Sequence, residues 1–323
     1  MKPPVFAYLA PQHLDEALEL AARGGDRTAP LAGGQSLVPL LNHRRLRPAA
    51  VLDLNRLRGL DTVTYETEEP PPVRNGATRN GATGNGETGR DLVRIGALAR
   101  LRTLERDARL AAALPVLRET VRLVAHPQIR SRSTLGGSLC HADPAAELPA
   151  LALALGARLR LSSLGGERVE EAADFYRPGG ATSRRPDELL TAVDLPLDPG
   201  FRFRFEEVTR AGQDGFPLVG VCLGVRCAED GTVTAARLAA AGVADRPLRL
   251  ADAERELRGQ RLAALAAGEL PAVLEAAADG SAPRSDHHGS ADYRRALLRT
   301  VVRRAAAHLA ETAGHSVRGG EAE

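Results

Sequence analysis

The stretch Leu31-Ala-Gly-Gly-Gln-Ser-Leu-Val-Pro-Leu-Leu41 combines the end of an apolar strand, a tight turn and the start of a helix. The paired glycines Gly33 and Gly34 let the backbone turn sharply and approach a ligand without a Cβ in the way. Ser36 can cap the helix and Pro39 suits its first turn, so free backbone N–H groups point outward. The pattern predicts an anion site for a phosphate or pyrophosphate, although a plain Gly-Gly loop with a serine cap gives the same isolated match.

A second glycine phrase further along the chain favours the ligand-binding interpretation. It has the sequence Thr134-Leu-Gly-Gly-Ser138 and is followed by His141-Ala-Asp-Pro-Ala-Ala-Glu147. Its paired glycines, flanked by hydroxyls, predict a second nest of backbone donors. Two such nests meeting one pyrophosphate would offer it more donors than either alone.

Composition narrows the class of protein. The chain has 323 residues, of which 43% are hydrophobic, so a sizeable core can be buried. Its 43 basic and 41 acidic residues leave a formal charge of only +2, and with 3% aromatic residues nucleic-acid binding is not expected. The longest apolar run, residues 148–157, is too short to span a membrane, and no signal peptide is visible, so a cytoplasmic location is expected.

Three cysteines, Cys140, Cys222 and Cys227, lack the spacing of a metal or iron–sulfur site. Cys222 and Cys227 lie five apart in a predicted strand, so their side chains point to opposite faces. All three are therefore interpreted as packing residues, and no metal site is expected.

Around the first glycine turn, the hydrophobic pattern predicts a small β-α-β-α-β unit. Its strands are expected at residues 5–9, 29–31 and 51–54, and its helices over residues 13–22 and after Ser36. Residues 66–90 differ in kind, because a phrase close to Arg-Asn-Gly-Ala-Thr recurs there three times after a proline-rich segment. Such residues cannot form a core, so a disordered surface insertion between two strands is expected.

Ordered structure is predicted to resume beyond this insertion. A strand is expected at residues 92–97, followed by two helices, the second glycine phrase, a helix over residues 145–155 and a strand over residues 157–161. Residues 178–200, rich in Pro, Gly and charge, are expected to cross to a second domain.

That second domain is predicted to be α+β and to span residues 201–312. Alternating patterns at residues 201–205, 219–225 and 232–240 predict a three-stranded antiparallel sheet. Helices expected over residues 249–258, 261–277 and 291–310 would cover it, and residues 313–323 would form a flexible tail.

Together these phrases resemble the flavin-binding medium subunits of the molybdenum hydroxylases, such as those of aerobic carbon monoxide dehydrogenase and bacterial xanthine dehydrogenases. The family's AGGQSLxPxL signature corresponds to residues 32–41 and its TxGGS…HADPAAE signature to residues 134–147. The Asp53-Leu54-Asn55 strand, the Pro186-Asp-Glu-Leu-Leu190 phrase and Tyr293-Arg-Arg295 match as well. The resemblance covers nearly the whole chain.

The resemblance implies a vanillyl-alcohol-oxidase-like (PCMH-type) FAD domain of two subdomains, about residues 1–60 and 91–177, followed by the α+β domain. It implies that FAD phosphates bind the two glycine turns, that Glu147 contacts the FAD sugar, and that Ile95 and Leu190 line the cofactor. The implied FAD-binding residues are Leu31, Ala32, Gly33, Gly34, Gln35, Ser36, Leu37, Ile95, Thr134, Gly136, Gly137, Ser138, Glu147 and Leu190.

Two neighbouring pairs of residues allow more than one interpretation. Arg130 and Arg132 either add positive potential near the pyrophosphate or are ordinary solvent-exposed side chains. His141 and Asp143 are expected to shape a turn and cap the following helix rather than to catalyse. No catalytic residue is assigned, because the chemistry would belong to the flavin.

Three positions depart from the family pattern. Ser133 replaces a glycine, so its backbone must avoid positive φ. Glu206 stands where many members have a lysine near the flavin, which would disfavour the anionic reduced flavin. In Gln213-Asp-Gly-Phe-Pro217 the acidic residue before the aromatic is displaced by one position.

The implied function is electron transfer within a multi-subunit oxidoreductase. Electrons would come from a large molybdopterin subunit through a small subunit with two [2Fe–2S] clusters, and would leave FAD for NAD or another acceptor. The alternatives are a stand-alone FAD-dependent oxidoreductase and a flavin-free scaffold or nucleotide-binding module.

Overall fold

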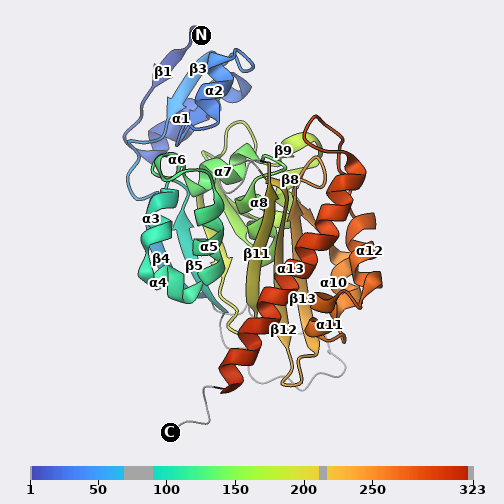
Figure 1. Cartoon of the computed structure of the whole chain (residues 1–323). Helices are drawn as coiled ribbons and strands as arrows, with labels where there is room; N and C mark the ends of the chain where they lie inside the picture. The colour runs from blue at the N-terminus through green and yellow to red at the C-terminus, as the bar shows by residue number, and fades with distance from the viewer. Residues whose placement is uncertain (1, 69–89, 211–216, 319–323) are drawn as a thin grey trace, which may run out of the picture.

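The computed structural model describes residues 2–68, 90–210 and 217–318. Three bodies follow one another along the chain (Figure 1): a small N-terminal unit, a middle unit around a five-stranded sheet, and a C-terminal unit around a four-stranded sheet. The long last helix crosses the C-terminal sheet, and the N-terminal unit lies at the opposite end of the molecule from the last described turns of that helix (Figure 1).

The N-terminal unit is the predicted β-α-β-α-β arrangement. Its strands are parallel in the order β1-β3-β2, and Ala17, Leu18 and Ala21 of the first helix pack with Leu52 of the central strand. The first strand is shorter than expected and begins at Ala7. The elements are β1 (Ala7–Leu9), α1 (Leu14–Gly24), the 3-10 helix η1 (Gly25–Arg27), β2 (Thr28–Leu31), α2 (Leu37–Asn42) and β3 (Ala50–Asp53).

The middle unit contains an antiparallel sheet in the order β4-β5-β10-β6-β7. Its strands are β4 (Val63–Glu68), β5 (Arg90–Gly96), β6 (Arg158–Ser163), β7 (Gly166–Glu171) and β10 (Leu189–Pro196). The predicted crossing segment 178–200 thus contains the central strand of this sheet. Alternating buried residues of β10, such as Val193 and Leu195, explain this correction, because they belong to the core.

Both ends of the predicted disordered insertion, residues 66–90, belong to strands. Residues 66–68 and Arg90 are parts of β4 and β5, because the two strands continue to pair there: Glu66 lies opposite Leu92 and Glu68 opposite Arg90. The rest of the predicted insertion, residues 69–89, lies outside the described residues.

Seven helices and a small hairpin complete the described part of the middle unit. They are α3 (Leu101–Arg106), α4 (Ala108–Ala113), α5 (Pro115–Leu123), α6 (Pro127–Arg130), α7 (Leu135–His141), α8 (Glu147–Leu155), α9 (Ala172–Phe175), β8 (Tyr176–Arg177), η2 (Pro178–Gly180) and β9 (Ala181–Thr182). Every residue of α8 is buried. A helix that is apolar all round must be enclosed on all sides, and α8 packs between β10 of the middle sheet and strands of the C-terminal sheet.

The C-terminal sheet has four antiparallel strands, not the three predicted. They are β11 (Arg202–Thr209), β12 (Pro217–Cys227), β13 (Val233–Ala241) and β14 (Leu248–Arg249), in that order. The fourth strand has only two residues, too few for an alternating pattern to reveal it in the sequence.

The two faces of the C-terminal sheet enter different cores, as strand alternation requires. Phe205 and Cys222 pack with the middle unit, whereas Val221 and Leu223 pack against the C-terminal helices. Cys227 also packs against that second core, so Cys222 and Cys227 face opposite sides as predicted.

The C-terminal helices cover the outer face of this sheet (Figure 1). They are α10 (Ala251–Leu257), α11 (Leu262–Ala267), α12 (Pro271–Asp279) and α13 (Ala291–Arg318). The single helix predicted over residues 261–277 is two helices, because Gly268 adopts a left-handed conformation (φ +82°) and Pro271 starts a new helix. The predicted flexible tail is helical through Arg318, and residues 319–323 lie outside the described part.

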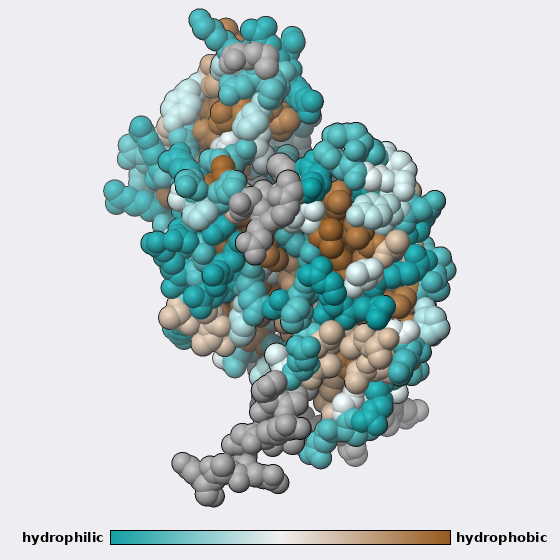
Figure 2. Space-filling model, viewed as in Figure 1, coloured by the Kyte–Doolittle hydropathy of each residue, from teal (hydrophilic) through white to brown (hydrophobic). Residues whose placement is uncertain are grey.

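The visible face of the molecule is mostly hydrophilic, with apolar side chains gathered within the N-terminal unit and near the upper end of the C-terminal unit (Figure 2). None of the helices in the described ranges combines the length and apolar character that a membrane crossing requires.

Candidate functional site

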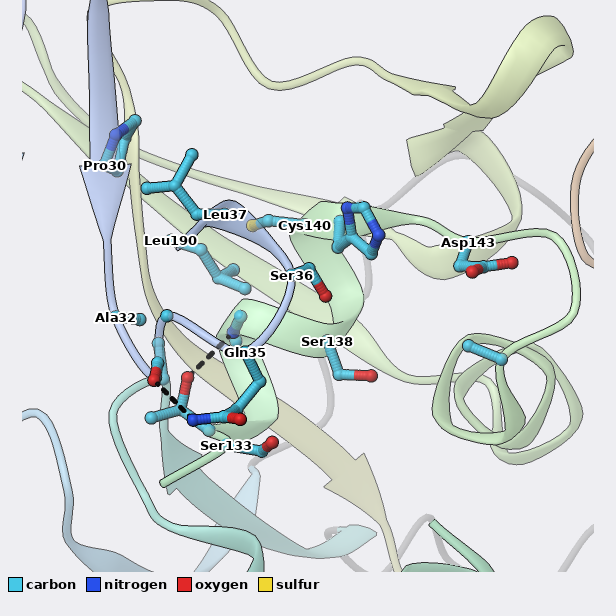
Figure 3. Close-up of a pocket in the computed structure, with 18 of the residues that line it drawn as sticks. Pro30, Ala32, Gln35, Ser36, Leu37, Ser133, Ser138, Cys140, Asp143 and Leu190 are labelled. Carbon is cyan, nitrogen blue, oxygen red and sulfur yellow. Dashed lines mark hydrogen bonds between the residues drawn. The ribbon is translucent and has the colours of Figure 1, made fainter. Parts of the chain in front are cut away.

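A cavity of about 730 Å³ lies where the N-terminal unit meets the middle unit, and both glycine phrases line it (Figure 3). The structure thus brings together two turns that are far apart in the sequence. The predicted site residues that line the cavity are Ala32, Gly33, Gly34, Gln35, Ser36, Leu37, Thr134, Gly136, Gly137, Ser138, Glu147 and Leu190.

Leu31 and Ile95 are placed outside the lining that the described residues form. Ile95 pairs with Val63 and Val193 in the middle of the sheet and is fully buried in the core. Leu31 is the last residue of β2, and its side chain contacts the turn at Gly34 rather than the cavity.

In the first glycine turn, residues 33–36, the backbone of Gly33 packs directly against the backbone just before the second phrase. A Cβ on Gly33 would lie 2.5 Å from the carbonyl oxygen of Arg132. Gly34 has φ +77°, a left-handed conformation that favours glycine. Ser36 occupies the N-cap position of α2, but its hydroxyl makes no capping bond to any described residue, so the predicted serine cap is absent and the hydroxyl remains available to a ligand.

The second phrase packs closely against neighbouring backbone, and its backbone N–H groups are not free to bind a ligand. Thr134 caps α7, since its Oγ1 accepts from the Gly137 N–H at 3.1 Å. The Gly136 N–H donates to the Ala97 carbonyl at 2.8 Å, and the Ser138 N–H donates to the Thr134 carbonyl. The predicted second nest of backbone donors is therefore already bonded within the protein. A Cβ on Gly136 would lie 2.6 Å from the Ala97 Cβ, which explains its glycine.

A side-chain bracket joins the two phrases. The Asn55 Nδ2 donates to the Ala32 carbonyl at 2.9 Å, and the Arg100 Nη2 donates to the Asn55 Oδ1 at 2.5 Å. The same guanidinium donates through Nη1 to the Arg132 carbonyl. Asn55 belongs to the matched Asp53-Leu54-Asn55 phrase, whereas nothing in the sequence pattern singles out Arg100.

Glu147 lines the cavity, and its carboxyl group interacts electrostatically with that of Glu207, which lies outside the lining. Glu147 begins α8 and is buried; burial raises its pKa to about 7, and the nearby Asp143 carboxylate adds to the rise. Burial also raises the pKa of Glu207 to about 8, with the charges of Glu147 and Glu206 contributing. The Glu207 Oε2 is buried and has no hydrogen-bond partner among the described residues.

Glu206, which the family pattern puts near the flavin, is not among the described residues that line the cavity. It lies on the face of β11 opposite Phe205 and Glu207, because side chains alternate along a strand. Its carboxylate accepts from Arg304 at 3.1 Å and pairs with the His308 ring at 2.8 Å, both on α13.

Several other predictions are resolved by local contacts. The non-glycine residues with positive φ in the described part are Arg44, Ala125 and Ala142, so Ser133 needs no such conformation. Arg130 is buried, so it is not the solvent-exposed side chain of one interpretation, whereas Arg132 is exposed.

His141 and Asp143 both line the cavity. The Asp143 Oδ1 accepts from the Ala145 N–H at 2.9 Å and shapes the turn, as expected, but α8 begins only at Glu147 with Ala146 as its N-cap, so Asp143 does not cap it. Of the displaced acidic phrase, residues 213–216 lie outside the described residues, and Pro217 lines the cavity.

Sequence reasoning missed one wall of the cavity, formed by Val124, Ala125 and His126. It also missed Arg184 and Cys140, which line the cavity as well. Burial raises the pKa of the Cys140 thiol to about 11, so it stays protonated near neutral pH. The left-handed Ala125, directly after a helix, is a conformation that no residue-type signal announces.

These residues fit a dinucleotide flavin. The volume lies within the usual range for ligand pockets, and both glycine turns line the cavity. Ser36 and Ser138 offer hydroxyls, and Leu37, Leu98 and Leu190 offer apolar surface. The fold and cavity define an FAD-binding protein.

Comparisons with known proteins agree with this class. Residues 4–78 and 85–198 match the family described as FAD binding domain in molybdopterin dehydrogenase, and residues 203–309 match the CO dehydrogenase flavoprotein C-terminal domain. The chain belongs to this family of FAD-binding subunits of the molybdenum hydroxylases, and as such is an oxidoreductase subunit.

Relatives span nearly the full chain. The 6-hydroxypseudooxynicotine dehydrogenase complex subunit alpha of Paenarthrobacter nicotinovorans is 36% identical over 305 residues, covering 94% of each chain. The carbon monoxide dehydrogenase medium chain of Afipia carboxidovorans is 33% identical, covering 94% of this chain and 96% of its own. The solved structure of quinoline 2-oxidoreductase from Pseudomonas putida 86 has a TM-score of 0.81 at 30% identity, covering 97% of this chain and 99% of its own.

Proposed function

We propose that FAD lies in the cavity of about 730 Å³ with its pyrophosphate between the two glycine turns. The observation that carries this proposal is that both glycine phrases, far apart in the sequence, line the same cavity. The first turn would donate backbone N–H groups to the phosphates, and the second would add the hydroxyl of Ser138. Glu147 would accept from a sugar hydroxyl, and Leu190 would contact the cofactor.

The flavin would supply the capacity to accept and pass on electrons, and the protein would bind, orient and enclose it. The similarity to a carbon monoxide dehydrogenase medium chain supports a role as one subunit of a larger complex. Its partners would be a small subunit with two [2Fe–2S] clusters and a large molybdopterin subunit. NAD or another external acceptor would then take the electrons, in the cytoplasm.

Residues 178–200 were expected to be a segment that crosses between the two domains, but the sheet arrangement supports a different boundary. We place β10 in the flavin domain, since it is the central strand of that domain's sheet. The flavin domain would then reach about as far as the family match, to residue 198, and the C-terminal domain would follow from residue 203.

The test is to express the chain alone and together with a small two-[2Fe–2S] subunit and a large molybdopterin subunit of the same family. The isolated chain is expected to bind one FAD, and a stable complex with both partners should co-purify. A chain that binds FAD but joins no partner, and whose flavin is reduced by a small organic substrate, would support a stand-alone oxidoreductase. A chain that refuses added FAD would overturn the proposal and favour a flavin-free scaffold or nucleotide-binding module.

A further inference from the structure

The cavity wall formed by Val124, Ala125 and His126 is held in an unfavourable backbone conformation. Ala125 has φ +44°, in the left-handed region that residues with a Cβ rarely adopt. Such a residue persists only when its surroundings hold it, and strained residues of this kind gather at ligand sites. The question is which group holds this one.

Arg130 supplies the holding contacts. Its Nη1 donates to the carbonyl oxygens of Ala125 at 2.6 Å, Val124 at 3.0 Å and Arg122 at 3.4 Å. One buried nitrogen thus gathers three carbonyls, one from the last turn of α5 and two from the segment between α5 and α6. The Arg130 side chain is only 7% exposed, so these hydrogen bonds are shielded from competing water.

A carboxylate fixes the orientation of this guanidinium. The Glu105 carboxylate of α3 accepts from the Arg130 Nε at 3.0 Å and from Nη2 at 3.4 Å, which directs Nη1 toward the turn. Arg102 donates to the same carboxylate at 2.7 Å from the more exposed side. Burial opposes ionisation of Glu105, but the two arginines outweigh it and lower its pKa. The Glu105 carboxyl is therefore ionised at neutral pH.

The position of Arg130 in the chain links it to the second glycine phrase. It ends α6, and the Ser133 N–H donates to the Ile129 carbonyl at 2.8 Å just before Thr134 caps α7. The same short helix therefore carries both the clamp on the 124–126 wall and the entry to the second phrase.

We infer that Arg130 is a positioning residue for the flavin: its guanidinium, oriented by Glu105, clamps Ala125 in the left-handed conformation and so sets the 124–126 wall of the cavity. This inference rests on the proposed function, in which FAD occupies that cavity. Arg130 does not touch the cavity and acts through Ala125.

The experiment compares the whole chain with R130K, A125G and the double variant R130K/A125G. Lysine keeps the positive charge but lacks the planar guanidinium. It therefore cannot bind the Glu105 carboxylate on one side and the three backbone carbonyls on the other. R130K is expected to bind FAD about tenfold more weakly, a change of about 1.4 kcal/mol. A125G alone serves as the reference for the double variant. The double variant should bind FAD about threefold more tightly than R130K, because glycine adopts the left-handed conformation without a clamp. R132K, at the exposed neighbouring arginine, is the matched control and should change nothing.

A readout without FAD separates this inference from the proposed function. Amide hydrogen exchange of residues 124–126 in the FAD-free chain should rise about tenfold in R130K and in E105Q, and not in R132K, because an unclamped turn opens more often. E105Q leaves the arginine itself unchanged but removes the charge that orients it, and this variant serves if R130K does not fold.

Unchanged exchange at residues 124–126 in both variants, or no rescue of FAD affinity by A125G, would overturn the clamp. Failure of the unaltered chain to bind FAD, with the exchange result as expected, would overturn the proposed function and leave the clamp standing as a property of the fold.

Discussion

At the scale of single residues, the site depends on how closely two backbones approach. Gly33 faces the carbonyl of Arg132 with no room for a Cβ, and Gly136 faces Ala97 in the same way. The bracket of Asn55 and Arg100 holds the two phrases at this distance by binding Ala32 on one side and Arg132 on the other. The cavity is thus set by contacts outside its own lining as much as by the lining.

Substituting Gly33 tests this close approach. In G33A the new Cβ would lie 2.5 Å from a backbone oxygen that cannot move without shifting the second phrase. FAD binding is expected to weaken at least tenfold, about 1.4 kcal/mol, measured by titrating the apoprotein with flavin fluorescence. G165A is the matched control, since its Cβ would meet only the Ser163 hydroxyl at an ordinary 3.5 Å. Equal affinities for the two variants would refute the contact.

The buried carboxyl of Glu147 predicts a pH dependence of stability. Its pKa rises from about 4.5 to about 7 on folding, so the folded chain holds this proton more tightly than the unfolded chain. The group therefore lowers stability as pH rises through that window. Thermal unfolding of the FAD-free chain across this window should show a smaller loss of stability in E147Q than in the unaltered chain. Parallel pH profiles would show that Glu147 titrates normally.

At the scale of elements, helix α8 is the centre of the molecule. It lies between the middle and C-terminal sheets, and its first residue, Glu147, lines the cavity. Its burial on all sides ties the flavin site to the packing of both sheets.

Truncating a central side chain of α8 should reduce stability strongly. Leu151 is 2% exposed, so L151A removes buried apolar surface and leaves a cavity, at an expected cost of about 2–5 kcal/mol. Chemical denaturation measures the loss. L164A, at a hairpin residue that is 60% exposed, should change stability by less than about 0.5 kcal/mol. Similar losses in both variants would show that α8 is not the central packing element.

The sequence predicted the elements whose signals are local. Glycine pairs and helix periodicity were enough for the two turns, for α1 and for the N-terminal sheet. The signals failed where tertiary packing decides: β10 was hidden in a polar segment, and β14 has two residues. Glu206 was placed near the flavin because a motif position does not say which face of a strand a side chain occupies, and the donors of the second phrase proved to be used within the fold.

At the scale of the whole molecule, the two domains share one core. Phe205, Cys222 and Ala239 of the C-terminal sheet pack in the same cluster as α8 and the middle sheet. Polar contacts add to this: the Gly242 N–H donates to the Pro144 carbonyl at 2.8 Å, and Arg204 pairs with Glu119 of α5 at 3.3 Å. The boundary between the domains is therefore a buried interface.

A fragment ending at residue 198 should not fold independently into a flavin-binding domain. Removing the C-terminal sheet would expose the apolar face of α8, and contiguous apolar surface of that kind promotes aggregation. The fragment is expected to bind a hydrophobic dye and to elute from size exclusion as aggregates, whereas the whole chain elutes as a discrete species. A well-behaved fragment with the FAD affinity of the whole chain would contradict the shared core.

The convergence of both glycine phrases on one flavin is tested most directly by amide hydrogen exchange of the apoprotein with and without FAD. The account predicts that residues 33–37 and residues 134–138 both gain protection at the same FAD concentration, while the exposed hairpin at residues 163–166 does not change. Protection of only one of the two phrases, at saturating FAD, would contradict it.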